Sequence, residues 1–116
     1  MSGVHRITIA GVGEFLDWRQ GSGQTVEIFD IHVPSERRRM GLGRKLVYEL
    51  IDHNLPPGTK KVWAITRANN CIAQDFYNEL NFRAIPLREF YDCYRCVDAI
   101  MYIWDVPNKQ ENASPR

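Results

Sequence analysis

The sequence has no long hydrophobic run, no excess of one charge and no internal repeat. No stretch approaches the about 20 consecutive apolar residues that a membrane-spanning helix needs. The first ten residues also lack the basic start and long apolar core of a secretory signal. We therefore expect a cytoplasmic protein with no membrane partner. The formal net charge of +1 over 116 residues gives no support to nucleic-acid binding as a general role.

Cysteine and histidine are scarce too, with three of each. A structural zinc site takes about four ligands, and Cys93 and Cys96 have no second Cys or His pair at a suitable spacing. Their segment has the pattern of a strand, whereas a redox pair normally begins a helix. We therefore predict no metal cofactor and interpret both residues as reduced thiols near a hairpin. A metal or redox role for this pair is the less favoured alternative.

The chain is long enough for one domain with a modest core, which we place at residues 1–106, followed by a polar tail at 107–116. Apolar spacing predicts an α+β fold: a mixed, mostly antiparallel sheet with helices on its faces, in the order β-β-β-α-β-α-β-β. The predicted strands are 4–10, 14–19, 25–33, 61–66, 83–90 and 99–106. One predicted helix runs from Gly43 to His53; the other is capped by Asn69 or Asn70 and ends near Asn81.

The most informative segment is the turn from Arg38 to Gly43, between an apolar strand and an amphipathic helix. The first N–H groups of a helix have no intrahelical partner, and the helix dipole favours an anion there. Gly41 and Gly43 have no Cβ, so phosphates could approach the backbone closely. The basic residues around the turn are Arg37, Arg38, Arg39, Arg44 and Lys45. The segment therefore predicts a diphosphate-binding site, with a merely solvated basic face as the alternative.

Two motifs in order carry a family resemblance. Arg38-Arg39-Met40-Gly41-Leu42-Gly43 fits Gln/Arg-x-x-Gly-x-Gly/Ala, and the segment from Asn70 to Phe82 fits Asn-x-x-Ala-x-x-aromatic/Leu-Tyr-x-x-x-Gly-Phe, with Asn81 in place of the glycine. With these motifs the chain resembles the GNAT superfamily of acetyl-CoA-dependent N-acetyltransferases over roughly residues 24–105. A weaker likeness is to the N-terminal amino-group acetyltransferases, including those that act on ribosomal proteins; it lies in Arg67-Ala68-Asn69-Asn70, Phe90-Tyr91 and Asp98-Ala99-Ile100-Met101.

The resemblance implies an enzyme with acetyl-CoA as co-substrate and direct attack by an amine. The backbone of Ile31, His32 and Val33 would pair with the pantetheine arm, and Asn70 would bind an amide of that arm. The pyrophosphate would lie against Arg38, Arg39, Met40, Gly41, Leu42, Gly43 and Arg44. Tyr77 would protonate the departing thiolate. The alternatives from the residues alone are a buried core tyrosine and a simple helix cap at Asn70.

The general base is assigned to Glu27, fourteen residues before the first motif glycine, where histone-acetylating relatives carry a glutamate. The ribosomal-type relatives use a glutamate two residues before the arginine of Arg67-Ala68-Asn69-Asn70, and Ile65 stands there instead. Uninterrupted strand alternation places Glu27 on one face with Phe29 and Ile31. Asp30 and His32, which share the other face, are the alternative pair.

The strand and two helices with which the family usually begins have no room before Val4, and in relatives they wall the amine site. We therefore expect an open acceptor site, or one that a homodimer or partner subunit completes; the sequence does not identify the amine. The alternative function is a catalytically weak acetyl-CoA- or CoA-binding module that acts with a partner protein.

Overall fold

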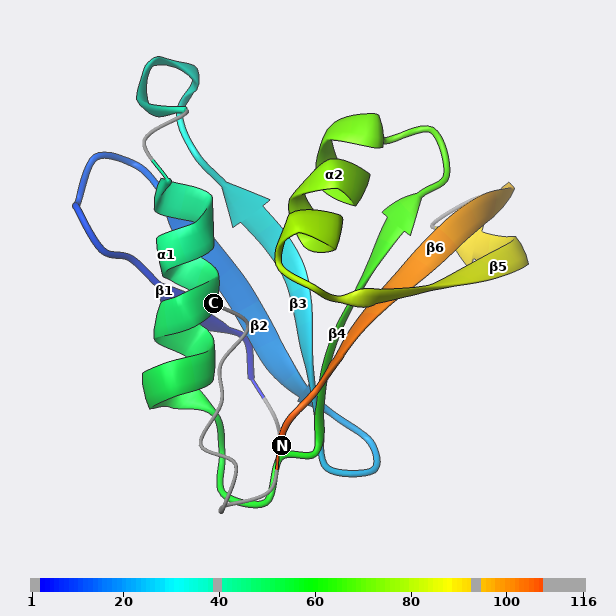
Figure 1. Ribbon diagram of the computed structural model, residues 1–116, viewed down its shortest axis with the longest axis horizontal. Helices are drawn as coiled ribbons and strands as arrows, with labels where there is room; N and C mark the ends of the chain where they lie inside the picture. Colours follow the sequence, from blue (N-terminus) through cyan, green and yellow to red (C-terminus); the bar gives the residue numbers. More distant parts are fainter. Residues whose placement is uncertain (1–2, 39–40, 93–94, 108–116) are drawn as a thin grey trace.

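The computed structural model describes residues 3–38, 41–92 and 95–107. Its strands are β1 (His5–Ile7), β2 (Phe15–Gly21), β3 (Thr25–His32), β4 (Lys61–Arg67), β5 (Arg83–Asp92) and β6 (Arg95–Asp105). Its α-helices are α1 (Leu42–Glu49) and α2 (Cys71–Glu79), as Figure 1 shows. This order confirms the predicted β-β-β-α-β-α-β-β succession and the mixed α/β fold class.

The strands form one sheet in the order β1-β2-β3-β4-β6-β5. Neighbouring strands are antiparallel except β3 and β4, which are parallel. That one parallel pair is short, because only Thr25–Glu27 of β3 pairs with Lys61–Trp63 of β4. Beyond this point β3 continues to His32 and β4 continues to Arg67, but the two strands no longer pair with each other. Figure 1 shows them parting. The sheet therefore divides in its middle.

Both α-helices pack on the same face of the sheet. The strand register places Val26 opposite Val62, and Val62 opposite Trp104, so these buried side chains share a face. The core that they join contains Leu46, Val47 and Leu50 from the α1 region and Tyr77 and Leu80 from the α2 region. In the described part of the chain no helix covers the opposite face, which we call the helix-free face.

The helix ends follow the chemistry expected at caps. Gly41, with φ of 75°, precedes α1, which continues as a π-helical segment η2 (Leu50–Asn54). The side chain of Asn70 accepts a hydrogen bond from the Ala73 N–H at 3.1 Å, so Asn70 caps α2. Asn81 follows α2 with φ of 64°, the left-handed conformation predicted for it.

The first strand is shorter than predicted because a carboxylate folds the following loop. Glu14 is only 1% exposed, and its carboxylate accepts backbone N–H groups from Ile9, Ala10, Gly11 and Val12. These hydrogen bonds lower the pKa of Glu14 to about 2. Residues 8–13 therefore form a loop around Glu14 and do not extend β1, and Glu14 is not the strand residue that the pattern predicted.

Within the described ranges, neither helix has the length and apolar character needed to cross a membrane. Cys93, the side chain of Cys96 and the predicted tail from residue 108 lie outside what the structure describes.

Candidate active site

The site lies where β3 and β4 part. We call the space between residues 28–32 of β3 and 64–67 of β4 the gap. The described sheet gives β3 no strand partner there, so backbone groups that point into the gap have no ladder hydrogen bonds. Ile31 and Val33, predicted to hold an amide-bearing ligand, lie along this stretch and are half-buried. His32 is exposed and stacks on Phe15 with ring centroids 5.4 Å apart. An extended ligand with amide groups would fit the gap as an added strand.

A β-bulge on β3 decides which side chains face the gap. Asp17 pairs with Asp30 and Trp18 pairs with Ile28, which leaves Phe29 as an extra residue. Because paired residues share a face, Glu27 lies with Arg19 on the helix-free face. Ile31 lies opposite the buried Leu16, on the other face. The prediction that Glu27 shares a face with Ile31 is therefore wrong, because the inserted residue shifts the alternation.

The helix-free face beside the gap is charged, and most of its charges are paired. Arg6 donates to both carboxylate oxygens of Asp17, at 2.8 and 2.9 Å. The Arg6 guanidinium thereby lowers the pKa of Asp17. Arg19 donates its Nε–H to Glu27 at 2.9 Å. Glu27, the predicted base, is thus held in an ion pair.

Asp30, like Glu27, lies on the helix-free face. Asp30 and His32 share the face, as predicted, because their partners on β2 are Asp17 and Phe15. Among the described residues, no hydrogen bond or ion pair joins Asp30 to another side chain. Its carboxylate is exposed.

Tyr77 is held rigidly on the helix side of the gap. It is 6% exposed and stacks on Tyr102 at 5.3 Å between ring centroids, with Phe76 at 5.2 Å and Phe82 at 5.3 Å around it. Burial raises the pKa of Tyr77 well above its usual value, and the negative charge of Asp30 raises it further. The phenol is therefore neutral at pH 7 and available as a hydrogen-bond donor.

Arg39 and Met40 of the predicted anion-binding turn lie outside the described residues, but the structure describes the residues on both sides of them. A short 3-10 segment, η1 (Ser35–Arg37), leads to Arg38, whose Nε–H donates to the Val33 carbonyl at 3.3 Å. The first α1 hydrogen bond runs from the Lys45 N–H to the Gly41 carbonyl, so the N–H groups of residues 42–44 have no helical partner. A Cβ added at Gly41 would meet no atom within 4 Å. This helix start therefore suits an anion.

Three predicted pyrophosphate contacts have additional structural roles. A Cβ at Gly43 would lie 3.1 Å from Cε1 of Phe76, so this glycine allows α1 and α2 to approach closely. Arg44 reaches Glu79 of α2 at 3.7 Å. The Leu42 side chain is buried in the core, which leaves only its backbone for a ligand.

Thr66 is a site residue that sequence reasoning missed. It lies on β4 beyond the parting point, on the helix side of the sheet, because Ala64 of the same strand faces Tyr102. Its buried hydroxyl has no hydrogen-bond partner among the described residues. Buried hydroxyls are normally paired, so this one fits the amide- or carbonyl-bearing arm of a ligand. No local pattern distinguishes Thr66 from an ordinary strand threonine.

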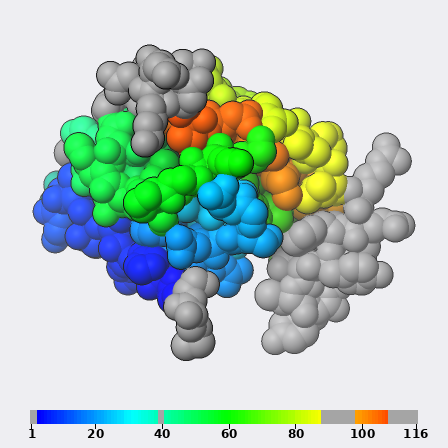
Figure 2. All heavy atoms as spheres, turned by 90° about the horizontal axis from the view of Figure 1, so that it is seen from below, coloured from blue at the N-terminus to red at the C-terminus, as the bar shows by residue number. Residues whose placement is uncertain are grey.

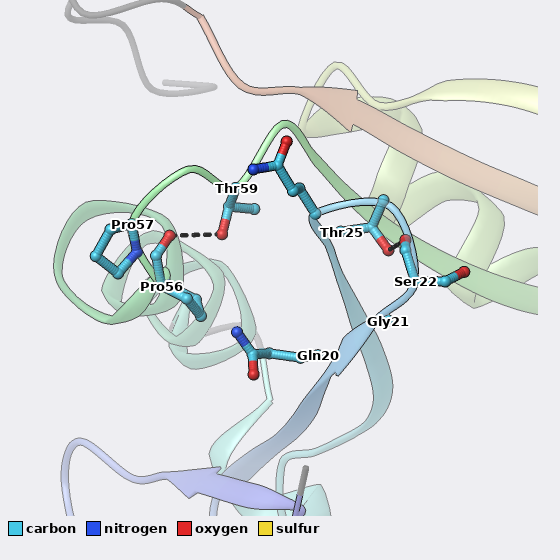
Figure 3. A pocket seen from close by; sticks show the side chains of 8 residues that line it. Gln20, Gly21, Ser22, Thr25, Pro56, Pro57 and Thr59 are labelled. Atoms are coloured by element: carbon cyan, nitrogen blue, oxygen red, sulfur yellow. Dashed lines mark hydrogen bonds between the residues drawn. The ribbon is translucent and has the colours of Figure 1, made fainter. Parts of the chain in front are cut away.

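A cavity of about 510 Å³ lies elsewhere, between the β2–β3 turn and the loop before β4 (Figure 3). Figure 2 shows this end, with the light-blue turn beside the green loop, and the Lys60 N–H donates to the Gln24 carbonyl there at 2.8 Å. Its lining is uncharged and includes none of the predicted site residues, so the cavity does not belong to the site. Among the described residues, no group of three or more His, Cys, Asp or Glu side chains is arranged to hold a metal.

Comparisons with known proteins point to one family. A family model described as Acetyltransferase (GNAT) family matches residues 4–82. The sequence is 36% identical over 64 residues to the ribosomal protein bS18 alanine N-acetyltransferase of Escherichia coli K12, a match that covers 55% of this chain and 43% of that enzyme. The match thus spans less than half of the enzyme's length.

Solved structures give the same result for the fold. The ribosomal-protein-S18-alanine N-acetyltransferase from Escherichia coli superposes with a TM-score of 0.70 at 28% identity, over 97% of this chain and 74% of that one. A Bacillus subtilis acetyltransferase in complex with CoA superposes with a TM-score of 0.69 at 18% identity, over 91% and 78%. At this lower identity the likeness shows the fold alone.

Proposed function

Because the chain belongs to the GNAT family of acetyltransferases, we propose that it moves the acetyl group of acetyl-CoA to a primary amine by direct attack. One observation carries the proposal. The unpaired stretch of β3 leads to Val33, whose Cγ2 would lie 3.9 Å from a Cβ at Gly43 near the start of α1. Tyr77 stacks on Tyr102, which pairs with Ala64 of β4, so these elements border one gap in the sheet. The strand would bind an extended arm, the helix start would bind an anionic group, and the phenol would serve a leaving thiolate.

The donor would lie along the gap. The backbone of residues 31–33 and the unpaired hydroxyl of Thr66 would bind its amide-bearing arm. The free N–H groups at the start of α1, with Arg38 beside them, would bind the diphosphate. Asn70 keeps its role as helix cap through its Oδ1, which leaves its amide NH₂ for the donor. A backbone N–H of the unpaired strand would stabilise the oxyanion.

Tyr77 would act as general acid toward sulfur. Its pKa is raised above the usual value of about 10, whereas a thiol titrates near about 8.5, so complete proton transfer to a free thiolate is uphill. The phenol would therefore donate its hydrogen bond while charge develops on sulfur, and its proton would move as the C–S bond breaks.

Two observations bear on the acceptor: the names of the relatives, and one residue that differs from the ribosomal-type pattern. The matched enzymes are named as alanine N-acetyltransferases of a ribosomal protein, which supports an α-amino group at a protein N-terminus. Ile65 stands where the ribosomal-type glutamate is expected, so the proton must leave by another route. The predicted homodimer or partner subunit stays a prediction, which light scattering on the active protein tests.

The test combines binding with turnover. Acetyl-CoA should raise the melting temperature, because a ligand of the folded state stabilises it. Tyr77→Phe should keep this shift while turnover falls by about 100-fold, the lower range for a general acid. Tyr102→Phe is the matched control, since it removes a hydroxyl from the same aromatic stack, and it should retain turnover. Unchanged turnover in Tyr77→Phe would refute the role of this phenol.

The second candidate is a CoA-binding module with weak catalysis, favoured by the ion pair that holds Glu27. It predicts the same thermal shift with acetyl-CoA but no release of free thiol with any amine. The thiol-release assay therefore separates the two functions directly.

A further inference from the structure

On the helix-free face, one carboxylate has no hydrogen-bonded partner among the described residues. Arg6 pairs with Asp17 and Arg19 pairs with Glu27, and both pairs lie at hydrogen-bond distance. Asp30 follows on the same face and makes no such pair with a described residue. Asp30 is therefore the carboxylate of this face that can still accept a hydrogen bond from an incoming ammonium group.

The gap connects this carboxylate with Tyr77, although the two residues belong to opposite faces. α2 packs on the helix side, and the bulge at Phe29 directs Asp30 to the helix-free side. The charge of Asp30 nevertheless acts on the phenol of Tyr77. A thioester in the gap would then have a proton donor on one side and a carboxylate on the other.

We propose that Asp30 binds the ammonium group of the acceptor and takes a proton from it, on the helix-free side of the gap. The inference rests on the proposed acetyl transfer and deepens it. The substrate class is a cationic primary amine that enters from the helix-free face. Asp30 thus replaces both Glu27, which Arg19 holds, and the ribosomal-type glutamate, whose position is Ile65.

The protons and bonds balance as follows. The R–NH₃⁺ nitrogen gives one proton to the Asp30 carboxylate, and its freed lone pair forms the N–C bond to the thioester carbonyl. The C–S bond then breaks, sulfur takes the Tyr77 proton, and a second proton from nitrogen restores the phenol. Asp30 releases its proton to water, so R–NH₃⁺ and acetyl-CoA give the acetylated amine, CoA thiol and one H⁺.

The neighbouring charged groups define what a pH profile reports. On the helix-free face these are Arg6 of β1, Asp17 and Arg19 of β2, Glu27 and His32 of β3, and Arg67 of β4, with Tyr77 of α2 across the gap. Asp30→Asn replaces the carboxylate with an amide of the same shape and leaves these side chains in place. It removes only the smaller, electrostatic contribution of Asp30 to the raised pKa values of Tyr77 and Arg6. Burial, the largest cause, still keeps the pKa of Tyr77 raised in this variant. A change in the profile near neutral pH therefore reports the carboxylate.

The experiment uses a short peptide that begins with a free Ala, together with its N-acetylated form as a probe without the ammonium group. At pH 7, Asp30→Asn should lower kcat/KM by about 100-fold. The rise in melting temperature that acetyl-CoA causes should be unchanged. Its residual rate should rise about tenfold per pH unit up to the pKa of the peptide amine, about 8, because the amine must then lose its proton to water. Asp30→Glu should recover part of the rate. Asp52→Asn, on η2, removes the same charge elsewhere and should match the wild type.

A binding measurement supplies a readout without turnover. With CoA in place of acetyl-CoA, calorimetry should show that the wild type prefers the free peptide over the acetylated one, and Asp30→Asn should lose this preference. If the kcat/KM of Asp30→Asn is within threefold of the wild-type value and its pH profile is unchanged, the assignment is overturned. A wild type that shows no acetyl-CoA shift contradicts the proposed function itself, before any Asp30 variant is compared.

Discussion

Replacing Gly43 with alanine tests whether this motif glycine serves helix packing. The added Cβ would lie 3.1 Å from Cε1 and 3.5 Å from Cζ of Phe76, and 3.9 Å from Cγ2 of Val33. The first distance is shorter than ordinary van der Waals contact, so the Phe76 ring or α2 must shift. The second and third distances require little movement.

Two opposing free energies set the size of the effect. An extra methyl group in a packed site costs about 1–3 kcal/mol, whereas Gly to Ala within a helix gains at most about 1 kcal/mol. The expected net result is a loss of about 1 kcal/mol in the free energy of unfolding. Phe76 is only half-buried, and its ring can therefore yield in part, which keeps the estimate in the lower part of the range.

Urea denaturation of a double-mutant cycle measures this contact. Adding Phe76→Leu removes the ring edge, so Gly43→Ala should cost less in that background, with a coupling of about 1 kcal/mol. Gly41→Ala is the matched control: its φ of 75° costs about 1–2 kcal/mol without a clash, and Phe76→Leu should not relieve it. If Gly43→Ala stabilises the protein, or if the cycle shows no coupling, the packing argument fails.

Two further variants test the loop and the helix end. The Glu14 carboxylate has its pKa lowered from 4.5 to about 2 by backbone N–H donors, so its stabilisation is complete above about pH 4.5 and is lost as the pH falls toward 2. Glu14→Gln should lower the melting temperature by several degrees at pH 7. It should also reduce the fall in melting temperature between about pH 4.5 and 2, measured by thermal unfolding from about pH 2 to 7. If this fall is the same in the variant, the role of Glu14 is contradicted. Asn81→Ala should cost about 1 kcal/mol in urea, because alanine tolerates a φ of 64° less well, and equal stability would show that this turn is not strained.

Elements governed by neighbours in sequence could be predicted. The apolar spacing of α1 gave its buried face, and that of α2 gave the buried Tyr77, although Ile72, which has the same spacing, is 81% exposed. The short side chains of Asn70 and Asn81 gave the helix ends. Each of these features depends on hydrogen bonds or contacts within about one helical turn. The element order followed for the same reason, since Gly and Pro turns separate the segments.

Features that depend on a distant partner could not be predicted. Glu14 looks like a strand residue, yet the loop before it supplies four N–H groups to its carboxylate. The unpaired hydroxyl of Thr66 is visible only once β3 and β4 are seen to part. The glycine pattern at residue 43 indicated a ligand, whereas the contact that its Cβ would make is with Phe76.

The bulge at Phe29 shows how one inserted residue can redirect a candidate active site. In an unbroken strand, Glu27 and Asp30 would face opposite sides, since side chains alternate with a period of two. The extra residue brings both carboxylates to the helix-free face, where Glu27 is paired with Arg19 and Asp30 makes no hydrogen bond or ion pair with a described side chain. The residue that a strict alternation favours as base is therefore engaged, while the residue three positions further on is free to meet a cation beside the gap. Bulges are frequent next to active sites because they re-aim side chains, and here the re-aimed group is the one whose charge reaches Tyr77.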